Sequence, residues 1–102
     1  MATISSDEAR RKLSDLPGWT LSGNEIRRQF TFKDFTEAMS YVVRLAFAAE
    51  AADHHPDILI SYKRVTLTYS THSEGGLTQK DFDGAAEASG IASRYVDPIP
   101  SS

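Results

Sequence analysis

Pro56 separates the two most regular patterns of the chain and limits what each of them can form. Upstream of it, apolar residues recur at spacings of three and four, as on one face of an α-helix. This stripe consists of Phe35, Ala38, Met39, Val42, Leu45, Ala46 and Ala49. Because proline disfavours the helical conformation at the preceding residue, we expect the helix that Asp34 caps to stop near His54 and the chain to leave it extended.

Two runs with the period of two that is typical of β-strands follow Pro56, and in the first of them Ile58, Ile60 and Tyr62 alternate with Leu59 and Ser61. One strand is expected over residues 58–62, after which Lys63 and Arg64 turn the chain. In the next run one face carries Val65, Leu67 and Tyr69, and the other carries Thr66, Thr68, Ser70 and His72. The two runs predict a hairpin whose polar face leads to His72.

The first 32 residues predict a short helix and another hairpin. Ser5 precedes a helix over residues 6–13, in which acidic residues come first and basic residues later, as suits the helix dipole. Runs over 19–21 and 26–32 are joined by turn residues, which indicates two strands. The expected core residues of this hairpin are Trp19, Phe30 and Phe32.

Thr78 and Asp81 have the spacing of a capping box at the start of a last helix. The expected order of elements is therefore α-β-β-α-β-β-α.

With 102 residues, 40% of them apolar, the chain fits one domain over 1–102, with frayed ends at about 1–4 and 97–102. Apolar residues beside the middle helix stripe, such as Val43 and Phe47, point to self-association.

Composition and charge exclude several classes of function. The chain has no cysteine, so disulfides, thiolate metal ligands and a cysteine nucleophile are excluded. A net charge of -3 without a clustered basic face argues against binding nucleic acid. No apolar run approaches about 18 residues, so we expect no membrane segment and a cytoplasmic protein.

All three histidines lie between Glu50 and His72. Glu50 and His54 are four residues apart, so on a helix they share a face, and the carboxylate and the helix end both favour an imidazolium that can act as a general acid. His55, held extended before Pro56, should point in a different direction. If the helix end and the strand end with His72 converge, three imidazoles surround one small cavity.

Two kinds of site remain open on these residues alone. Three neutral imidazoles could hold zinc with a water at the fourth position. The same imidazoles could instead carry out metal-free acid and base catalysis on a polar heterocycle. Spacing does not decide between them.

Several motifs together resemble the signature of the pterin-4a-carbinolamine dehydratases. They are Glu50-x-x-Asp53-His54-His55-Pro56, Tyr62, Ser70-Thr71-His72 and Gly76-Leu77-x-x-x-Asp81, with Gly18-Trp19 and Phe30-x-Phe32-Lys33-Asp34-Phe35 upstream. The spacing from His-His-Pro to Thr-His is highly specific, and the resemblance spans nearly the whole chain. It implies an α+β fold with a four-stranded antiparallel sheet, three helices packed on one face, and assembly as a homo-oligomer, usually a tetramer.

The implied reaction is the dehydration of 4a-hydroxytetrahydropterin to quinonoid dihydropterin, which recycles the cofactor of aromatic amino acid hydroxylases. The family is metal-free, so the resemblance favours acid and base catalysis with no cofactor other than the pterin substrate. The alternative that it leaves open is a non-catalytic oligomerisation or coactivator module of the same fold.

The resemblance also assigns roles to residues. The catalytic group is expected to comprise His54, His72, Glu50 and Asp81, with Glu50 supporting His54. The residues expected to bind the pterin are His54, His55, Pro56, Thr71, His72, Ser73 and Glu74. A capping box would by itself account for Asp81, so its catalytic part is an open alternative.

Overall fold

The computed structural model describes residues 3–95. Its elements are α1 (Ser6–Leu13), β1 (Thr20–Ser22), β2 (Glu25–Thr31), α2 (Phe35–Ala52), β3 (Asp57–Ser61), β4 (Arg64–Tyr69), a 3-10 turn η1 (His72–Glu74) and α3 (Gln79–Ala92). The predicted order of three helices and four strands is confirmed, and η1 is an addition to it. None of the helices in this range is both long and apolar enough to cross a membrane.

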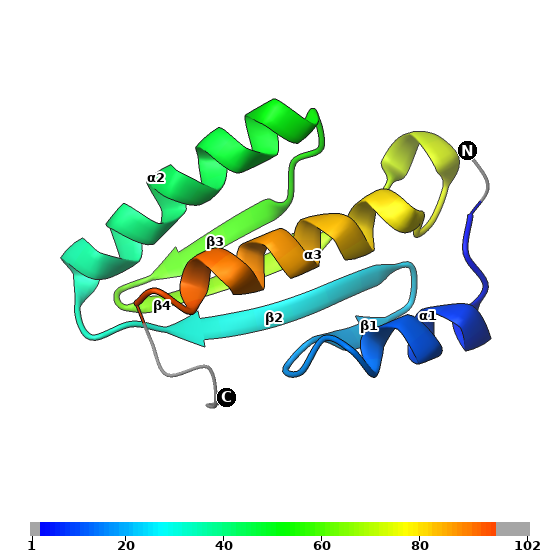
Figure 1. Ribbon diagram of the computed structural model, residues 1–102, viewed down its shortest axis with the longest axis horizontal. Helices are drawn as coiled ribbons and strands as arrows, with labels where there is room; N and C mark the ends of the chain where they lie inside the picture. Colours follow the sequence, from blue (N-terminus) through cyan, green and yellow to red (C-terminus); the bar gives the residue numbers. More distant parts are fainter. Residues whose placement is uncertain (1–2, 96–102) are drawn as a thin grey trace.

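The four strands form one antiparallel sheet in the order β1-β2-β4-β3. The two hairpins therefore join through β2 and β4, where Ile26 lies opposite Tyr69 and Phe30 opposite Val65. Helices α2 and α3 contact each other and β4, and they lie side by side over the sheet, while α1 packs at β1 (Figure 1). The predicted α+β class, with the helices on one face of the sheet, is confirmed.

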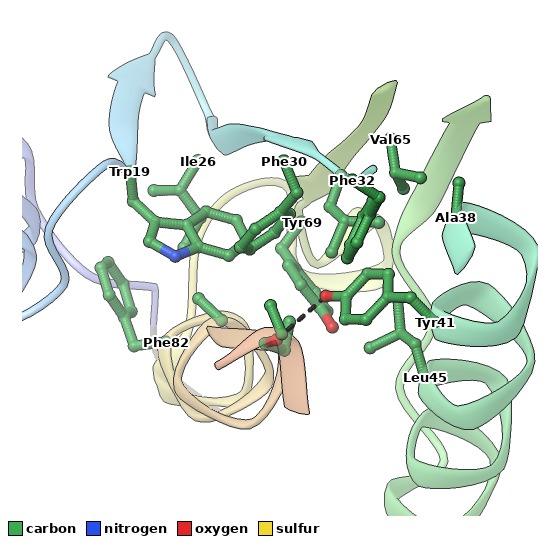
Figure 2. Packing of buried hydrophobic residues seen from close by; sticks show 14 of the residues in the cluster. Trp19, Ile26, Phe30, Phe32, Ala38, Tyr41, Leu45, Val65, Tyr69 and Phe82 are labelled. Atoms are coloured by element: carbon green, nitrogen blue, oxygen red, sulfur yellow. Dashed lines mark hydrogen bonds between the residues drawn. The ribbon is translucent and has the colours of Figure 1, made fainter. Parts of the chain in front are cut away.

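Aromatic rings fill the space between the sheet and the helices (Figure 2). Trp19, Phe30 and Phe32 are buried as predicted, and Tyr41 of α2 packs against both phenylalanine rings, with centroids 5.5 and 4.9 Å away. The Tyr41 hydroxyl donates to the carbonyl oxygen of Ala88 at 2.9 Å, which ties α2 to α3. Burial raises the pKa of Tyr41, so its hydroxyl remains a donor.

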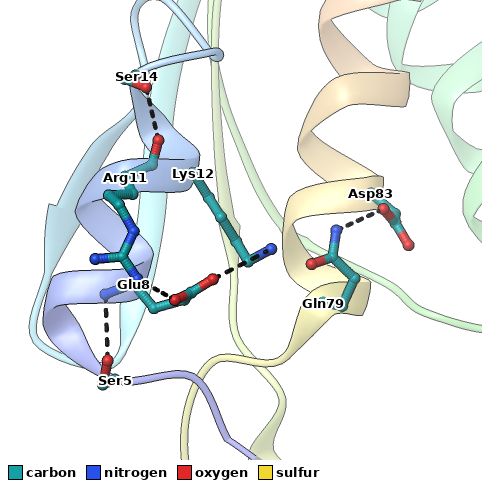
Figure 3. Close-up of polar contacts among 7 residues, drawn as sticks. All are labelled: Ser5, Glu8, Arg11, Lys12, Ser14, Gln79 and Asp83. Atoms are coloured by element: carbon teal, nitrogen blue, oxygen red, sulfur yellow. Dashed lines mark hydrogen bonds and ion pairs between the residues drawn. The ribbon is translucent and has the colours of Figure 1, made fainter.

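The predicted helix starts are confirmed by their caps. The Ser5 hydroxyl accepts from the backbone N–H of Glu8 (Figure 3), and the Asp34 carboxylate accepts from that of Glu37. At α3, the Thr78 side chain caps the helix. The Asp81 carboxylate accepts from the backbone N–H of Thr78, which completes the capping box. Each cap satisfies amide groups that have no partner within the helix.

The end of α2 differs from the prediction. The helix stops at Ala52, two residues before His54, because Asp53 adopts a left-handed conformation with φ of 54°. The backbone N–H of His54 then donates to the Ala49 carbonyl at 3.2 Å, as in a Schellman motif. At the other end, Phe35 is half exposed and does not belong to the core stripe.

Strand β4 is also shorter than expected. It ends at Tyr69, and His72 lies in η1 rather than on the polar face of the strand. Thr71 and Gly76 pair as an isolated bridge, and this closes a loop around η1. Turn residues between β3 and β4 are Tyr62 and Lys63, while Arg64 is already in β4.

The fraying expected at about 1–4 stays a prediction, and residues 1–2 lie outside the described residues. The backbone N–H of Ile4 donates to the carbonyl oxygen of Leu77 at 2.7 Å, because the chain before α1 passes beside the segment that leads into α3. The fraying expected at 97–102 lies outside the described residues.

Replacing Tyr41 with Phe should test the link between the two long helices. The ring remains, but the hydrogen bond from α2 to the Ala88 carbonyl is lost in the core, so we expect the free energy of unfolding to fall by about 0.5–1.5 kcal/mol. Urea denaturation followed by circular dichroism measures this, with Thr36→Ala at an exposed position of α2 as the control. Equal midpoints for Tyr41→Phe and the wild type would contradict the role given to this hydrogen bond.

Candidate active site

The buried carboxylate of Asp81 is the centre of the site. Oδ1 lies 2.6 Å from Nε2 of His54, and Oδ2 accepts from the Thr71 hydroxyl at 2.7 Å and from the Thr78 backbone N–H at 3.0 Å. The Asp81 side chain is fully buried, whereas 14% of the His54 side chain is exposed. One carboxylate thus connects the chain after α2, the chain after β4 and the start of α3.

The directions of these hydrogen bonds follow from the donors available. Thr71 donates its only hydroxyl hydrogen to Asp81, so in the 2.9 Å contact between the hydroxyls of Thr71 and Thr78 the donor is Thr78. Two donors already meet Oδ2, which fits an ionised carboxylate. We infer that Asp81 accepts the Nε2 proton of His54, which leaves Nδ1 as the ring nitrogen open to other partners.

The capping box and the contact with His54 use different oxygens of Asp81. Oδ2 belongs to the cap, and Oδ1 reaches His54. The two readings of Asp81 that the sequence left open are therefore compatible, because the residue caps α3 and at the same time binds a predicted catalytic histidine. Whether Asp81 takes part in catalysis stays a prediction.

The predicted pairing of Glu50 with His54 is wrong. Glu50 binds His55, with 2.7 Å between Oε1 and Nε2, and both side chains of this pair are more than half exposed. The left-handed Asp53 takes His54 off the helical path, so the spacing of four residues no longer places it above Glu50. A carboxylate does support His54, but it comes from α3. An exposed pair such as Glu50 with His55 contributes little to stability.

His72 lies next to the Asp81 cluster through the backbone. It directly follows Thr71, whose hydroxyl binds Asp81 and whose carbonyl accepts from Glu74 and Gly76. The His72 side chain is exposed, as are the neighbouring predicted binding residues Ser73 and Glu74. The loop is closed at Gly75, where φ of 76° favours glycine.

A groove of about 210 Å³ opens beside His54 between α2 and α3. Its apolar wall is formed by Leu45, Ala48, Ala49 and Ala52, and its polar wall by Lys80, Asp83 and Glu87. Tyr69 and Gly84 also line it, but His55 and His72 do not. The structure therefore connects His54 and His72 through Asp81 and Thr71, and it does not place all three imidazoles around this groove.

Sequence reasoning missed Tyr69 as a neighbour of the site. Its ring stacks on the imidazole of His54, with centroids 6.0 Å apart and planes inclined by 20°. The available signal was its position as the last inward residue of β4, two residues before Thr71. Tyr69 was expected only on the same face of the strand as Val65 and Leu67.

The donor set for a metal ion is sparse. Within residues 3–95, no three side chains of the His, Asp and Glu types are grouped so that they could hold a metal ion. His54 and His55, adjacent in sequence, instead bind separate carboxylates on different helices. The three-histidine zinc arrangement is therefore not formed by these side chains.

Comparison with known proteins identifies the family of the chain. The family model described as pterin 4 alpha carbinolamine dehydratase matches residues 2–91. A protein from Roseiflexus sp. (strain RS-1) that carries this family name is 56% identical over 88 residues, which is 85% of this chain and 95% of the relative. A relative of the same name from Sulfolobus acidocaldarius is 40% identical over 88 residues, covering 86% and 97%.

Two solved structures are similar in fold. The crystal structure of a transcriptional coactivator/pterin dehydratase from Brucella melitensis has a TM-score of 0.85 and 37% identity, and covers 88% of this chain and 98% of its own. A pterin dehydratase-like protein identified as a RuBisCO assembly factor of the alpha-carboxysome has a TM-score of 0.60 at 19% identity, covers 72% and 86%, and shows the fold alone. From the family match and these identities, the chain belongs to the pterin 4 alpha carbinolamine dehydratase family.

Proposed function

We propose that the protein is a hydro-lyase that dehydrates 4a-hydroxytetrahydropterin to quinonoid dihydropterin. The C4a–O bond breaks, the oxygen leaves as water after receiving a proton, and N5 loses its proton as the new C4a–N5 double bond forms. The reaction therefore needs one proton donor and one acceptor. His54 is the donor in this proposal and His72 is the acceptor.

The observation that carries the proposal is the contact between Asp81 and His54. Because Asp81 holds Nε2 of His54 at 2.6 Å, this imidazole can exchange a proton with substrate only through Nδ1. Its opposite oxygen binds Thr71, the residue before His72, so the same buried group contacts His54 and the residue next to His72. A positioned acid or base contributes about 10²- to 10⁴-fold to a rate.

We also propose which residues bind the pterin and in which cellular role the reaction serves. Pro56, Thr71, Ser73 and Glu74 are proposed to line the pterin together with His55. Because the Thr71 hydroxyl is already engaged by Asp81 and Thr78, this residue would contact a ligand through its other atoms. We propose no metal and no further cofactor, and a cytoplasmic role in recycling the pterin of aromatic amino acid hydroxylases.

Replacing His72 with Ala should remove the proton acceptor and lower kcat for pterin 4a-hydroxyl dehydration by about 10²- to 10⁴-fold. The assay compares the loss of 4a-hydroxytetrahydropterin with the uncatalysed rate, in the presence of a metal chelator that should leave the wild-type rate unchanged. His55→Ala, which removes an exposed histidine paired only with Glu50, serves as the matched variant and should chiefly raise KM. Wild-type protein that does not exceed the uncatalysed rate would overturn the enzyme and leave the alternative, a non-catalytic oligomerisation or coactivator module.

Replacing Asp81 with Asn should impair both folding and catalysis. An amide can still accept from His54, but its NH₂ group then faces the Thr78 N–H, so a buried donor loses its acceptor. We expect the free energy of unfolding to fall by about 1–3 kcal/mol and kcat to fall as well. The control is Asp83→Asn two residues further along α3, where the carboxylate is exposed and binds Gln79 at 2.9 Å (Figure 3). Equal losses of stability and of kcat in the two variants would contradict the role proposed for Asp81.

We also propose that the protein binds a second copy of itself through β3. This strand is an edge of the sheet within the described chain, so one side of it offers unpaired backbone groups. Large apolar side chains are exposed on and beside it, namely Ile58, Leu59 and Tyr62. An antiparallel pair of β3 strands is self-complementary, because the end with Asp57 in one copy lies toward the end leading to Lys63 in the other.

A lysine at Leu59 should weaken this association, because an edge strand carrying a charge pairs poorly with a second strand. Leu59 is 64% exposed in the single chain, so the substitution spares the core. Sedimentation velocity should show a shift toward the monomer for Leu59→Lys but not for Thr20→Lys on the opposite edge strand β1. A wild type that sediments as a monomer, or a Leu59→Lys variant that sediments as the wild type does, would refute the interface.

A further inference from the structure

Tyr69 and His54 form a stacked pair inside the fold. Their ring centroids are 6.0 Å apart with an angle of 20° between the planes, and Tyr69 is 2% exposed. Burial raises the pKa of the Tyr69 hydroxyl, and the negative charges of Glu87 and Asp81 add to this effect. The Tyr69 side chain that stacks on His54 is therefore uncharged at every pH at which a histidine can act as an acid or a base.

Gly84 of α3 is what allows the Tyr69 ring to lie there. A Cβ atom at this position would stand 2.6 Å from Cε1 and 2.9 Å from Cζ of Tyr69, closer than such atoms approach in proteins. Glycine in the middle of a helix is otherwise unfavourable. The same helix carries Gly90, where an added Cβ would meet nothing within 4 Å. The two glycines thus provide a matched pair in one helix.

The hydrogen bond to Asp81 fixes only one atom of the imidazole. A ring held at Nε2 alone can still swing about that contact, and the direction of Nδ1 changes as it swings. A flat aromatic face against the imidazole blocks this motion on one side. The stack and the hydrogen bond together restrict the direction of Nδ1.

We propose that Tyr69 is a positioning residue for His54 and that Gly84 makes the space in which the Tyr69 ring can act. The kinetic part of this inference rests on the function proposed above, whereas its spectroscopic part does not. Neither residue is expected to touch the reacting atoms. The phenol hydroxyl is dispensable in this arrangement, and the aromatic ring is not.

The experiment compares Gly84→Ala with Gly90→Ala in the full chain. The methyl group at residue 84 must push the Tyr69 ring, so the ring-current shifts of the His54 imidazole protons should change in ¹H–¹³C spectra. The expected kinetic effect is a fall in kcat of about 10- to 100-fold with little change in KM, as for other misplacements of a catalytic group. Gly90→Ala should leave the His54 signals and the rate as they are.

Substitution of Tyr69 itself separates the ring from the hydroxyl. Tyr69→Phe should keep the wild-type His54 shifts and kcat, and Tyr69→Leu should lose both. Should Tyr69→Leu not fold, Gly84→Ala and Tyr69→Phe still decide the matter, since both retain an aromatic ring at residue 69. Unchanged His54 signals in Gly84→Ala, or signals that move equally in Gly90→Ala, would overturn the inference. Signals that change as expected in a protein with no dehydratase activity would refute the proposed function and leave the positioning intact.

Discussion

The rest of the structure around the site depends on one buried charge. Asp81 has no exposed surface, and an ionised carboxylate in such a place is tolerated only when its oxygens are well supplied with donors. Its donors are His54, Thr71 and Thr78, which come from three separate parts of the chain. The carboxylate therefore fixes the end of α2, the loop after β4 and the start of α3 relative to one another. Rigid surroundings hold a proton-transferring side chain in place without rearrangement during each turnover.

The main features of the fold were predictable because each element carries its own local signals. Ser5, Asp34 and Thr78 mark the three helix starts, and the alternation around Val65 to Tyr69 marks the inward face of β4. The predicted element boundaries differ from the structure where the backbone conformation departs from what the pattern of apolar residues indicates. Asp53 turns left-handed and ends α2 early, and the bridge between Thr71 and Gly76 converts the expected end of the strand into a turn. A left-handed conformation is uncommon in residues other than glycine, so the sequence around Asp53 did not indicate that the helix ends there.

The sequence named the candidate residues but not the pairing of the histidines. The histidines could be named from their grouping in the chain and Asp81 from the family resemblance, whereas the partner of each histidine depends on which helix faces it. Glu50 lies four residues before His54, the spacing of neighbours on one face of a helix, yet the carboxylate that contacts His54 is Asp81. The stack of Tyr69 on His54 was harder still to predict from the sequence, because it depends on the close approach of α3 to Tyr69 at Gly84. A glycine within a helical pattern does not indicate which side chain packs against it.

The central claim is that Asp81 accepts the Nε2 proton of His54 inside the protein. NMR spectroscopy of the protein with ¹⁵N-labelled histidine tests it directly, through the imidazole nitrogen shifts and the exchange rate of the ring proton with water. We expect His54 to have a slowly exchanging proton on Nε2, with nuclear Overhauser contacts to Thr71 or Thr78. A His54 ring proton that exchanges as fast as that of the exposed His72, or one that resides on Nδ1 in the neutral ring, would contradict the account.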